Sequence, residues 1–307
     1  MPEARIAPFP PELATIRDWV RYAVSRFRAA NLDFGHGTDN AWDEAIFLIL
    51  ALLHLPLDQL EPFQDARLTA AERTTLYQAI ERRAVDRVPV PYLTHQAWLG
   101  PFKFYVDERV IIPRSFIAEL LQERLSPWIA EPDRITSALD LCTGSGCLAV
   151  LIADAFPNAD IDAVDISADA LAVAQHNVAA YGLQDRINLV RSDLFTNIDA
   201  EDKTYDLIIS NPPYVTNAAM ADLPAEYRHE PEIALAAGED GMNAIRQIIR
   251  GARSHLNVGG MLVIEAGHNR AQVEAAFPGL PLTWLVTPSS EDKVLLVPRE
   301  ELPVGTD

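Results

Sequence analysis

Asp140-Leu-Cys-Thr-Gly-Ser-Gly146 is the stretch of sequence that decides the fold. It overlaps a short apolar segment, residues 138–142, and precedes residues 148–155, whose apolar side chains recur with helical spacing. Glycines at a strand-to-helix turn let the backbone bend tightly and approach a ligand closely. We therefore expect a β-strand, a ligand-binding turn and an α-helix, the unit from which doubly wound α/β domains are built.

The same alternation of strands and helices continues toward the C-terminus. We expect helices over residues 168–181 and 242–255, and further strands over residues 160–165, 187–190, 207–210, 261–265, 283–286 and 294–297. Short apolar strands that alternate with helices form a parallel sheet covered on both faces. The last two strand candidates are separated from each other by a short stretch made mainly of Pro, Ser, Glu and Asp residues. These two strands are expected to pair as a hairpin, so the sheet should end with an antiparallel strand.

The N-terminal part of the chain has a helical pattern instead. Apolar residues from Ile16 to Ala30 recur at three- and four-residue spacing, a second apolar helix is expected from Asp43 to about residue 53, and Thr69 with Glu72 resembles a capping box that opens a third. Val88-Pro-Val-Pro-Tyr92 is expected to be a stiff linker, because each proline fixes its own φ.

Residues 97–112 follow this linker, and Gly100-Pro101 separates two β-prone runs within them, which predicts a hairpin. The expected organisation is a helical domain that recognises the substrate over residues 1–90, a linker and hairpin over 91–112, and an α/β domain over 113–307.

The chain is strongly acidic. It has 25 Lys and Arg residues against 44 Asp and Glu residues, which gives a formal net charge of −19. Such a charge repels phosphate backbones and attracts cationic partners. Solubility alone also explains an acidic surface, but the charge argues against an enzyme dedicated to duplex DNA and against a stable complex with nucleic acid.

The sequence shows no membrane or metal signal. The longest apolar run, residues 45–57, contains His54 and Pro56 and is too short to span a bilayer, and the N-terminus lacks a secretion signal. We therefore expect no membrane association and a cytoplasmic location. Cys142 and Cys147 are the only cysteines, and two thiols alone make neither a metal site nor a disulfide scaffold.

Two acidic residues favour a nucleoside ligand at the glycine-rich turn. Asp165 ends the next strand, 21 residues after Gly144 (165 − 144), where a carboxylate can bind ribose hydroxyls. Asp193, at the end of the third strand, can accept a hydrogen bond from an adenine amine while Leu194 packs against the ring. Taken alone, such a residue is more often a helix cap or part of a solvated turn, but its place at the carboxyl end of a strand favours a ligand contact. The turn lacks the third glycine of the dinucleotide fingerprint and the lysine of the triphosphate loop, which indicates a ligand without phosphates.

The fourth strand ends in Asn211-Pro-Pro-Tyr214, which is the strongest signal in the chain. Pro212 and Pro213 fix two successive φ angles and remove two backbone donors, leaving a stiff loop that presents carbonyl acceptors. Asn211 adds a side-chain oxygen and Tyr214 an aromatic face.

Two rigid acceptors suit an NH2 group conjugated to an sp2 carbon. Its lone pair is delocalised, so it needs alignment with the methyl donor, and its N–H bonds become more acidic as the new bond forms. Hydrogen bonds to the Asn211 side chain and the Pro212 carbonyl then strengthen in the transition state. This logic fits a glutamine amide and equally the exocyclic amine of a nucleic-acid base. A non-catalytic module that only binds the cofactor is a further alternative, which the intact motif argues against.

Taken in order, these motifs resemble those of the class I methyltransferases that modify glutamine in proteins. The resemblance rests on Cys142-Thr-Gly-Ser-Gly146, Asp165, Ser192-Asp-Leu-Phe195 and Asn211-Pro-Pro-Tyr214, and it covers nearly the whole chain. It implies a Rossmann-like, seven-stranded and mostly parallel sheet with an antiparallel last strand, and S-adenosyl-L-methionine as cofactor.

Two subfamilies fit the resemblance, one acting on peptide-chain release factors and one on the large-subunit ribosomal protein L-three. The release-factor type usually has Gly-Thr-Gly-Ser/Thr-Gly and Ile-Pro-Arg-Pro-Glu-Thr. This chain has Cys142 at the first glycine and Ile112-Pro-Arg-Ser-Phe-Ile117 instead, which with Pro91-Tyr-Leu-Thr94 resembles the ribosomal-protein subfamily. A basic ribosomal protein is therefore the expected partner.

The resemblance also implies roles for individual residues. The expected substrate-binding residues are Asn211, Pro212, Pro213, Tyr214 and Glu230, of which Asn211, Pro212 and Tyr214 are also expected to be catalytic. The expected cofactor-binding residues are Cys142, Thr143, Gly144, Ser145, Gly146, Asp165, Asp193, Leu194 and Asn211. No metal site is implied.

Overall fold

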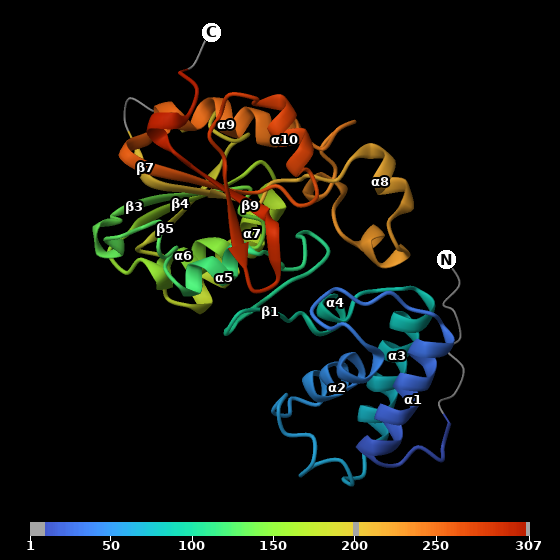
Figure 1. Cartoon of the computed structure of the whole chain (residues 1–307). Helices are drawn as coiled ribbons and strands as arrows, with labels where there is room; N and C mark the ends of the chain where they lie inside the picture. Colours follow the sequence, from blue (N-terminus) through green and yellow to red (C-terminus); the bar gives the residue numbers. More distant parts are fainter. Residues whose placement is uncertain (1–9, 199–202, 305–307) are drawn as a thin grey trace. The chain divides into compact units, whose positions relative to one another are not determined.

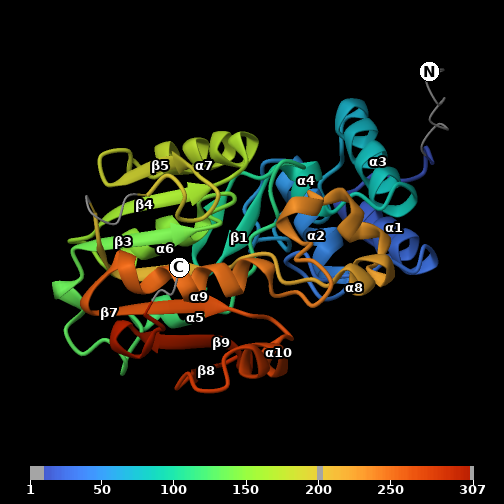
Figure 2. The same ribbon diagram turned by 90° about the horizontal axis from the view of Figure 1, so that it is seen from above.

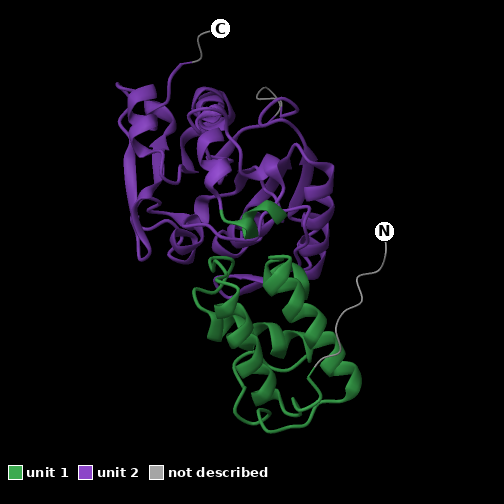
Figure 3. Cartoon of the chain, turned by 90° about the vertical axis from the view of Figure 1, so that its right-hand side faces the viewer, with its two compact units in different colours: residues 1–96, 224–229 green, residues 97–223, 230–307 purple. Residues whose placement is uncertain are grey.

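The computed structural model describes residues 10–198 and 203–304. Within these, the chain divides into two compact units (Figure 3). The helical unit comprises Met1–Gln96 and Pro224–His229, and the α/β unit comprises Ala97–Leu223 and Glu230–Asp307. The ends of the domains expected from the sequence, residues 1–9 and 305–307, lie outside the described residues.

The helical unit begins with three helices that the sequence signals correctly. They are α1 (Ile16–Ala29), α2 (Ala41–Leu52) and α3 (Ala70–Val85) (Figure 1). The capping box of Thr69 and Glu72 is present, and Asn40 caps α2 by accepting hydrogen bonds from the Trp42 and Asp43 backbone nitrogens. The three helices bury a common apolar core that includes Trp19, Phe27, Leu48, Ile49, Leu76 and Ile80.

The expected linker over residues 88–92 was wrong in part, because Val90–Thr94 forms a short helix, α4. Proline is compatible with the first turn of a helix, where its missing N–H has no intrahelical partner to lose. Pro91 occupies such a position, and Val90, Pro91 and Tyr92 are buried. The side chains in this segment therefore pack into the helical unit instead of remaining extended.

A segment distant in sequence completes the helical unit. Pro224–His229 belongs to it, and Glu226 within this segment accepts hydrogen bonds from Arg83 at 3.1 Å and Arg87 at 3.2 Å. Arg83 also binds Glu44 at 2.7 Å, and the side chains of Arg83, Glu44 and Glu226 are almost fully buried. A buried network of charges thus joins this segment to α2 and α3.

The α/β unit contains the expected seven-stranded sheet. Its strand order is β5-β4-β3-β6-β7-β9-β8, and β5, β4 and β3 lie side by side in Figure 2. The first five strands in this order, β5, β4, β3, β6 and β7, pair in parallel. Strand β9 pairs antiparallel with both β7 and β8, as expected. The strands are β3 (Ser137–Leu141), β4 (Asp160–Asp165), β5 (Ile187–Arg191), β6 (Tyr205–Ser210), β7 (Leu256–Glu265), β8 (Thr283–Thr287) and β9 (Ser290–Pro298).

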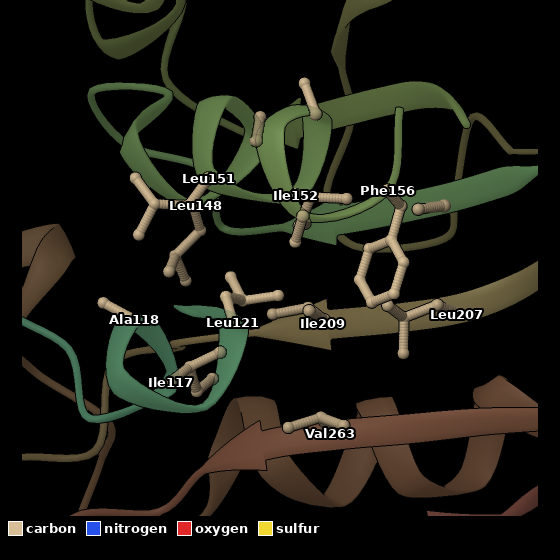
Figure 4. Packing of buried hydrophobic residues seen from close by; sticks show 14 of the residues in the cluster. Ile117, Ala118, Leu121, Leu148, Leu151, Ile152, Phe156, Leu207, Ile209 and Val263 are labelled. Atoms are coloured by element: carbon tan, nitrogen blue, oxygen red, sulfur yellow. The ribbon is translucent and has the colours of Figure 1, made fainter. Parts of the chain in front are cut away.

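Helices cover both faces of this sheet. On one face α5 (Ile117–Gln122) and α6 (Cys147–Ala155) pack against β6 and β7 through residues such as Leu121, Ile152, Ile209 and Val263 (Figure 4). On the other face lie α9 (Asn243–His255) and α10 (Arg270–Ala276). The remaining helical elements of the unit are α7 (Ala168–Ala180), α8 (Asn217–Asp222) and the 3-10 turns Pro132–Arg134, Glu232–Ala234 and Arg299–Glu301.

The expected hairpin after residue 97 is present but shorter than expected. Strands β1 (Ala97–Leu99) and β2 (Phe102–Phe104) pair antiparallel around Gly100, whose φ of +58° suits the turn. Residues beyond Phe104 leave the hairpin and lead to α5 without a regular element. Among residues 10–198 and 203–304, no helix has the length and apolar character needed to cross a membrane.

Candidate active site

The residues singled out in the sequence lie at one edge of the sheet. In the parallel registers Leu141 pairs with both Val164 and Ser210, and Asp165 pairs with Arg191. The carboxyl ends of β3, β4, β5 and β6 are therefore level with one another. From β3 the chain adds β4 and β5 on one side of the sheet and then β6 and β7 on the other, so the topological switch point lies between β3 and β6. Ligands of such sheets bind at this point.

The glycine-rich turn after β3 has a left-handed backbone at three positions. Cys142, Gly144 and Gly146 have φ angles of 60°, 54° and 77°. A Cβ on Gly146 would lie 3.1 Å from the Ala174 side chain, so glycine there permits α6 and α7 to pack closely. The turn is further fixed by the Thr143 hydroxyl, which donates to the buried Asp140 carboxylate at 2.6 Å.

Asp165 is held against this turn. Its carboxylate accepts hydrogen bonds from the backbone nitrogens of Gly144 and Ser167, both at 2.9 Å. Burial raises the pKa of Asp165 above its usual value, while these two hydrogen bonds act in the opposite direction. The carboxylate has a fixed orientation, and each of its oxygens has lone pairs left for a ligand hydroxyl.

Asp193 and Leu194 follow β5 at the same edge. Asp193 is exposed, and its backbone carbonyl accepts a hydrogen bond from the Thr196 nitrogen at 3.0 Å. Leu194 has a φ of 45° and is partly buried against the α9 side of the sheet. The two residues thus begin a tight turn, with Asp193 exposed to solvent and Leu194 packed against the core on the α9 side of the sheet.

Asn211 has an orientation that its neighbours determine. Its side-chain nitrogen donates to the backbone carbonyl oxygen of Arg114 at 3.2 Å. A carbonyl only accepts hydrogen bonds, so the amide nitrogen must face Arg114 and the amide oxygen must point elsewhere. Asn211 is partly exposed, and Pro212 after it is buried. An acceptor oxygen is therefore available on a rigid loop.

Tyr214 is packed and hydrogen-bonded at the end of this loop. A Cβ on Gly267 would lie 2.4 Å from the Tyr214 ring, so the ring occupies the space that a side chain at position 267 would need. The Tyr214 hydroxyl donates to Glu265 at 3.3 Å, and its backbone carbonyl accepts from the Asn269 side chain at 2.7 Å. The aromatic ring is thereby held in one place.

Glu265 was not singled out from the sequence, although it ends an expected strand at this edge. Its carboxylate also accepts hydrogen bonds from the Ser115 hydroxyl at 2.6 Å and from the Phe116 backbone nitrogen at 2.9 Å. Burial raises the pKa of Glu265 to about 6, although these hydrogen bonds favour the ionised form. Glu265 could have been identified from the sequence by its position at the carboxyl end of an expected strand, the same position that singled out Asp165.

Glu230 is buried and is paired with Arg114, which is partly exposed. The two form a bidentate ion pair, with nitrogen–oxygen distances of 2.5 and 2.6 Å, and the Glu230 side chain has 0% exposure. The Glu230 carboxylate also accepts a hydrogen bond from the Ile112 backbone nitrogen at 3.0 Å. Arg114 was a second residue missed from the sequence, although the motif that contains it was recognised.

Comparisons with known proteins define the class of this protein. The family described as "Methyltransferase small domain" matches residues 118–226. The solved structure of the hMettl16 catalytic domain in complex with MAT2A 3′UTR hairpin 1 has a TM-score of 0.50 and 15% identity, covering 80% of this chain and 88% of that one. At this identity the likeness shows the fold alone, and that fold is the α/β fold of a methyltransferase.

Curated relatives narrow the class to one family. The ribosomal protein uL3 glutamine methyltransferase of Neisseria gonorrhoeae is 57% identical over 291 residues, which span 95% of this chain and 96% of the relative. The protein of the same name from Burkholderia pseudomallei is 57% identical over 300 residues, 96% of this chain and 97% of that relative. The chain belongs to the ribosomal protein uL3 glutamine methyltransferase family.

Proposed function

We propose that this protein transfers a methyl group from S-adenosyl-L-methionine to the side-chain amide nitrogen of a glutamine in ribosomal protein uL3. The observation that carries the proposal is the identity of 57% to uL3 glutamine methyltransferases over 95% of the chain. The arrangement of acceptors at the carboxyl edge of the sheet supports it independently, because it suits a conjugated NH2 group.

The cofactor would be held by the turn after β3 and by the ends of β4 and β5. The donor set fits a nucleoside, since the Asp165 carboxylate is fixed by two backbone nitrogens and retains lone pairs for ribose hydroxyls. Asp193 would accept from the adenine amine and Leu194 would pack on the ring. The remainder of the cofactor would be enclosed by Asn211 and by the residues of the turn, which are Cys142, Thr143, Gly144, Ser145 and Gly146.

When bound, S-adenosyl-L-methionine supplies a sulfonium methyl group, whose S–C electron pair returns to sulfur as the new N–C bond forms. Asn211 and Pro212 would accept the two N–H bonds of the glutamine amide through the side-chain oxygen and the backbone carbonyl. These acceptors hold the nitrogen with its lone pair aimed at the methyl group, and alignment of this kind is worth roughly 7–11 kcal/mol in favourable intramolecular systems.

No strong general base is needed for this reaction. The amide nitrogen becomes acidic once the methyl group has arrived, so its surplus proton passes to water. The two hydrogen bonds strengthen at the same time, and each charge-assisted bond contributes about 1.5–3 kcal/mol. Pro213 would keep the loop stiff and Tyr214 would offer its ring to the flat amide, while Glu265 holds the Tyr214 hydroxyl at 3.3 Å.

The formal charge of −19 supports a basic protein as partner and disfavours a stable complex with nucleic acid. Ribosomal proteins are made and assembled in the cytoplasm, which is where we propose that this enzyme acts. The helical unit would recognise the substrate, because it is the part of the chain outside the methyltransferase fold.

The test is incubation of the purified protein with methyl-labelled cofactor and purified uL3, followed by mapping of the label by mass spectrometry. We expect one methylated glutamine in uL3, and transfer at least about a hundredfold slower by the Asn211→Ala variant. Parallel reactions offer a release factor and nucleic acid, with and without RNase. Label that stays on uL3 after RNase treatment supports the proposal, and label found only on the release factor or the nucleic acid overturns it.

A further inference from the structure

A short strap of backbone, residues 112–116, supplies the hydrogen-bond partner of Asn211. The carbonyl oxygen of Arg114, in the middle of the strap, accepts the bond from the Asn211 side-chain nitrogen at 3.2 Å. This bond decides which way the amide of Asn211 faces, because the carbonyl has no proton to donate. The side-chain oxygen of Asn211 is therefore aimed by the position of one backbone carbonyl.

Two buried carboxylates hold the strap from its two ends. Glu230 binds the Arg114 guanidinium at 2.5 and 2.6 Å and accepts from the Ile112 nitrogen at 3.0 Å. Glu265 accepts from the Ser115 hydroxyl at 2.6 Å and from the Phe116 nitrogen at 2.9 Å. The Arg114 carbonyl lies between these two attachments in the sequence, so neither half of the strap can shift without breaking a hydrogen bond to a carboxylate.

The Arg114–Glu230 ion pair is suited to fixing the position and direction of the strap. A bidentate pair between a guanidinium and a carboxylate defines direction as well as distance. Residues 112–115 lie in no helix or strand, and the strap joins α5 only at its end, where the Ser115 and Phe116 carbonyls accept hydrogen bonds from the Ala118 and Glu119 nitrogens, both at 3.2 Å. A displacement of about 1 Å in a group that orients a reactant can cost on the order of a hundredfold in rate.

We propose that Arg114 and Glu230 are positioning residues for methyl transfer, which fix the Arg114 carbonyl and through it the side-chain oxygen of Asn211. The proposal rests on the role proposed above for Asn211 in holding the glutamine amide. It gives Glu230 an indirect action, which agrees with a side chain of 0% exposure whose carboxylate is bound by Arg114. Direct contact of Glu230 with the substrate is the competing interpretation.

The variants Glu230→Gln and Arg114→Met test the pair, and Arg114→Lys keeps the charge but not the bidentate geometry. We expect kcat to fall by about tenfold to a hundredfold in the first two and by less in Arg114→Lys. The KM for uL3 and the calorimetric affinity for the cofactor should change by less than about twofold, because the pair acts on orientation and not on binding.

Arg124→Met is the matched control. Arg124 also joins a carboxylate, Asp133 at 2.6 Å, and a backbone carbonyl, that of Ala155 at 2.8 Å, but neither partner lies at the site edge. Its kcat should equal that of the parent. If Arg124→Met loses kcat as Arg114→Met does, the loss reflects general loosening of the fold and the positioning role is overturned.

The decisive measurement repeats the substitutions in the Asn211→Ala background, using single turnovers with enzyme in excess. Residues that act through Asn211 should cost nothing further once its side chain is gone. A raised KM and a full additional loss in that background would instead show that Glu230 contacts the substrate directly.

A parental rate in Asn211→Ala itself would contradict the proposed function, whereas a parental rate in Glu230→Gln and Arg114→Met contradicts only the positioning role. If Glu230→Gln does not fold, the same measurements are made on Arg114→Lys instead.

Discussion

The carboxylate of Asp165 accepts a hydrogen bond from the backbone nitrogen of Gly144 at 2.9 Å, across 21 residues of sequence. The bond joins the end of β4 to the turn after β3, so the two parts of the proposed nucleoside site have a fixed separation. It also removes freedom from a turn whose left-handed glycine backbone would otherwise be adaptable. A ligand that uses both parts finds them already arranged.

Asp165→Ala should weaken cofactor binding by about 1.5–3 kcal/mol, the range for a hydrogen bond to a charged group. The substitution removes the proposed acceptor for the ribose hydroxyls together with the bond to Gly144. Isothermal titration calorimetry with S-adenosyl-L-methionine measures the change. Asp133→Ala, an exposed carboxylate away from the site edge, is the control. Unchanged affinity in Asp165→Ala would mean that the ribose is bound elsewhere.

Asn211→Ala should reduce methyl transfer by at least about a hundredfold, as does removal of one preorganised polar group in other enzymes. The variant should keep most of its cofactor affinity, because Asn211 is proposed to act mainly on the glutamine amide. Asn211→Asp is a useful companion, since it keeps an oxygen but replaces the donor that binds the Arg114 carbonyl. Transfer by Asn211→Ala at the parental rate would refute the mechanism, whatever the substrate.

The elements that sequence predicts well are those with a local signature. The strand over residues 160–165 and the helix cap at Thr69 and Glu72 agree with the structure because periodicity and capping involve near neighbours. The ends of four parallel strands must share an edge, which is why Asp165 and Asn211 could be placed together before any coordinates. The helix at residues 90–94 was missed because proline fits both a linker and a first helical turn.

What could not be predicted depends on pairs far apart in the chain. Arg114 and Glu230 are 116 residues apart and Ser115 and Glu265 are 150 apart, so no periodic pattern connects them. The chain topology brings them together, and only the burial of Glu230 and Glu265 in the structure shows that these carboxylates bind protein groups and not solvent. For the same reason no local pattern indicated that Pro224–His229 belongs to the helical unit.

Glu265 should make stability depend on pH in the acidic range. Its pKa is about 6 in the folded protein against an ordinary value of 4.5. Between these values the unfolded chain ionises while the folded protein keeps the proton, so stability is fully present below about pH 4.5 and falls as pH rises through 6. The expected loss is about 2 kcal/mol, since one pKa unit corresponds to about 1.4 kcal/mol.

The measurement is urea unfolding of the parent and of Glu265→Gln across this pH range. Glutamine cannot ionise, so the difference in unfolding free energy between the two proteins should change by about 2 kcal/mol from pH 4.5 to pH 7. Asp140, whose pKa burial raises to about 7, is present in both proteins and cancels in the difference. Parallel curves would show that Glu265 is ionised throughout.

Arg83→Met should destabilise the helical unit by about 3–5 kcal/mol, because it leaves the carboxylates of Glu44 and Glu226 buried with their shared partner lost. Hydrogen exchange of peptides from α3 and from residues 224–229 reports this unit locally. The exposed pair Arg17–Asp65 provides the control, and Arg17→Met should leave the stability close to that of the parent, because exposed ion pairs contribute little. Equal protection in both variants would mean that the buried network contributes no net stability.

The last prediction concerns the partner and its dependence on salt. An enzyme with a formal charge of −19 and a basic ribosomal protein attract one another at long range, so association should slow as salt rises and the Debye length falls below about 8–10 Å. Methylation of uL3 at limiting concentration should therefore decline with added salt while kcat at saturation stays constant. A release factor and duplex DNA, offered at the same concentration, should receive little label. A rate on uL3 that salt leaves unchanged would remove charge as a determinant of partner choice without affecting the methylation chemistry. Preferential label on the release factor would overturn the assignment of substrate, which rests on curated relatives that are 57% identical to this chain and are named as uL3 glutamine methyltransferases.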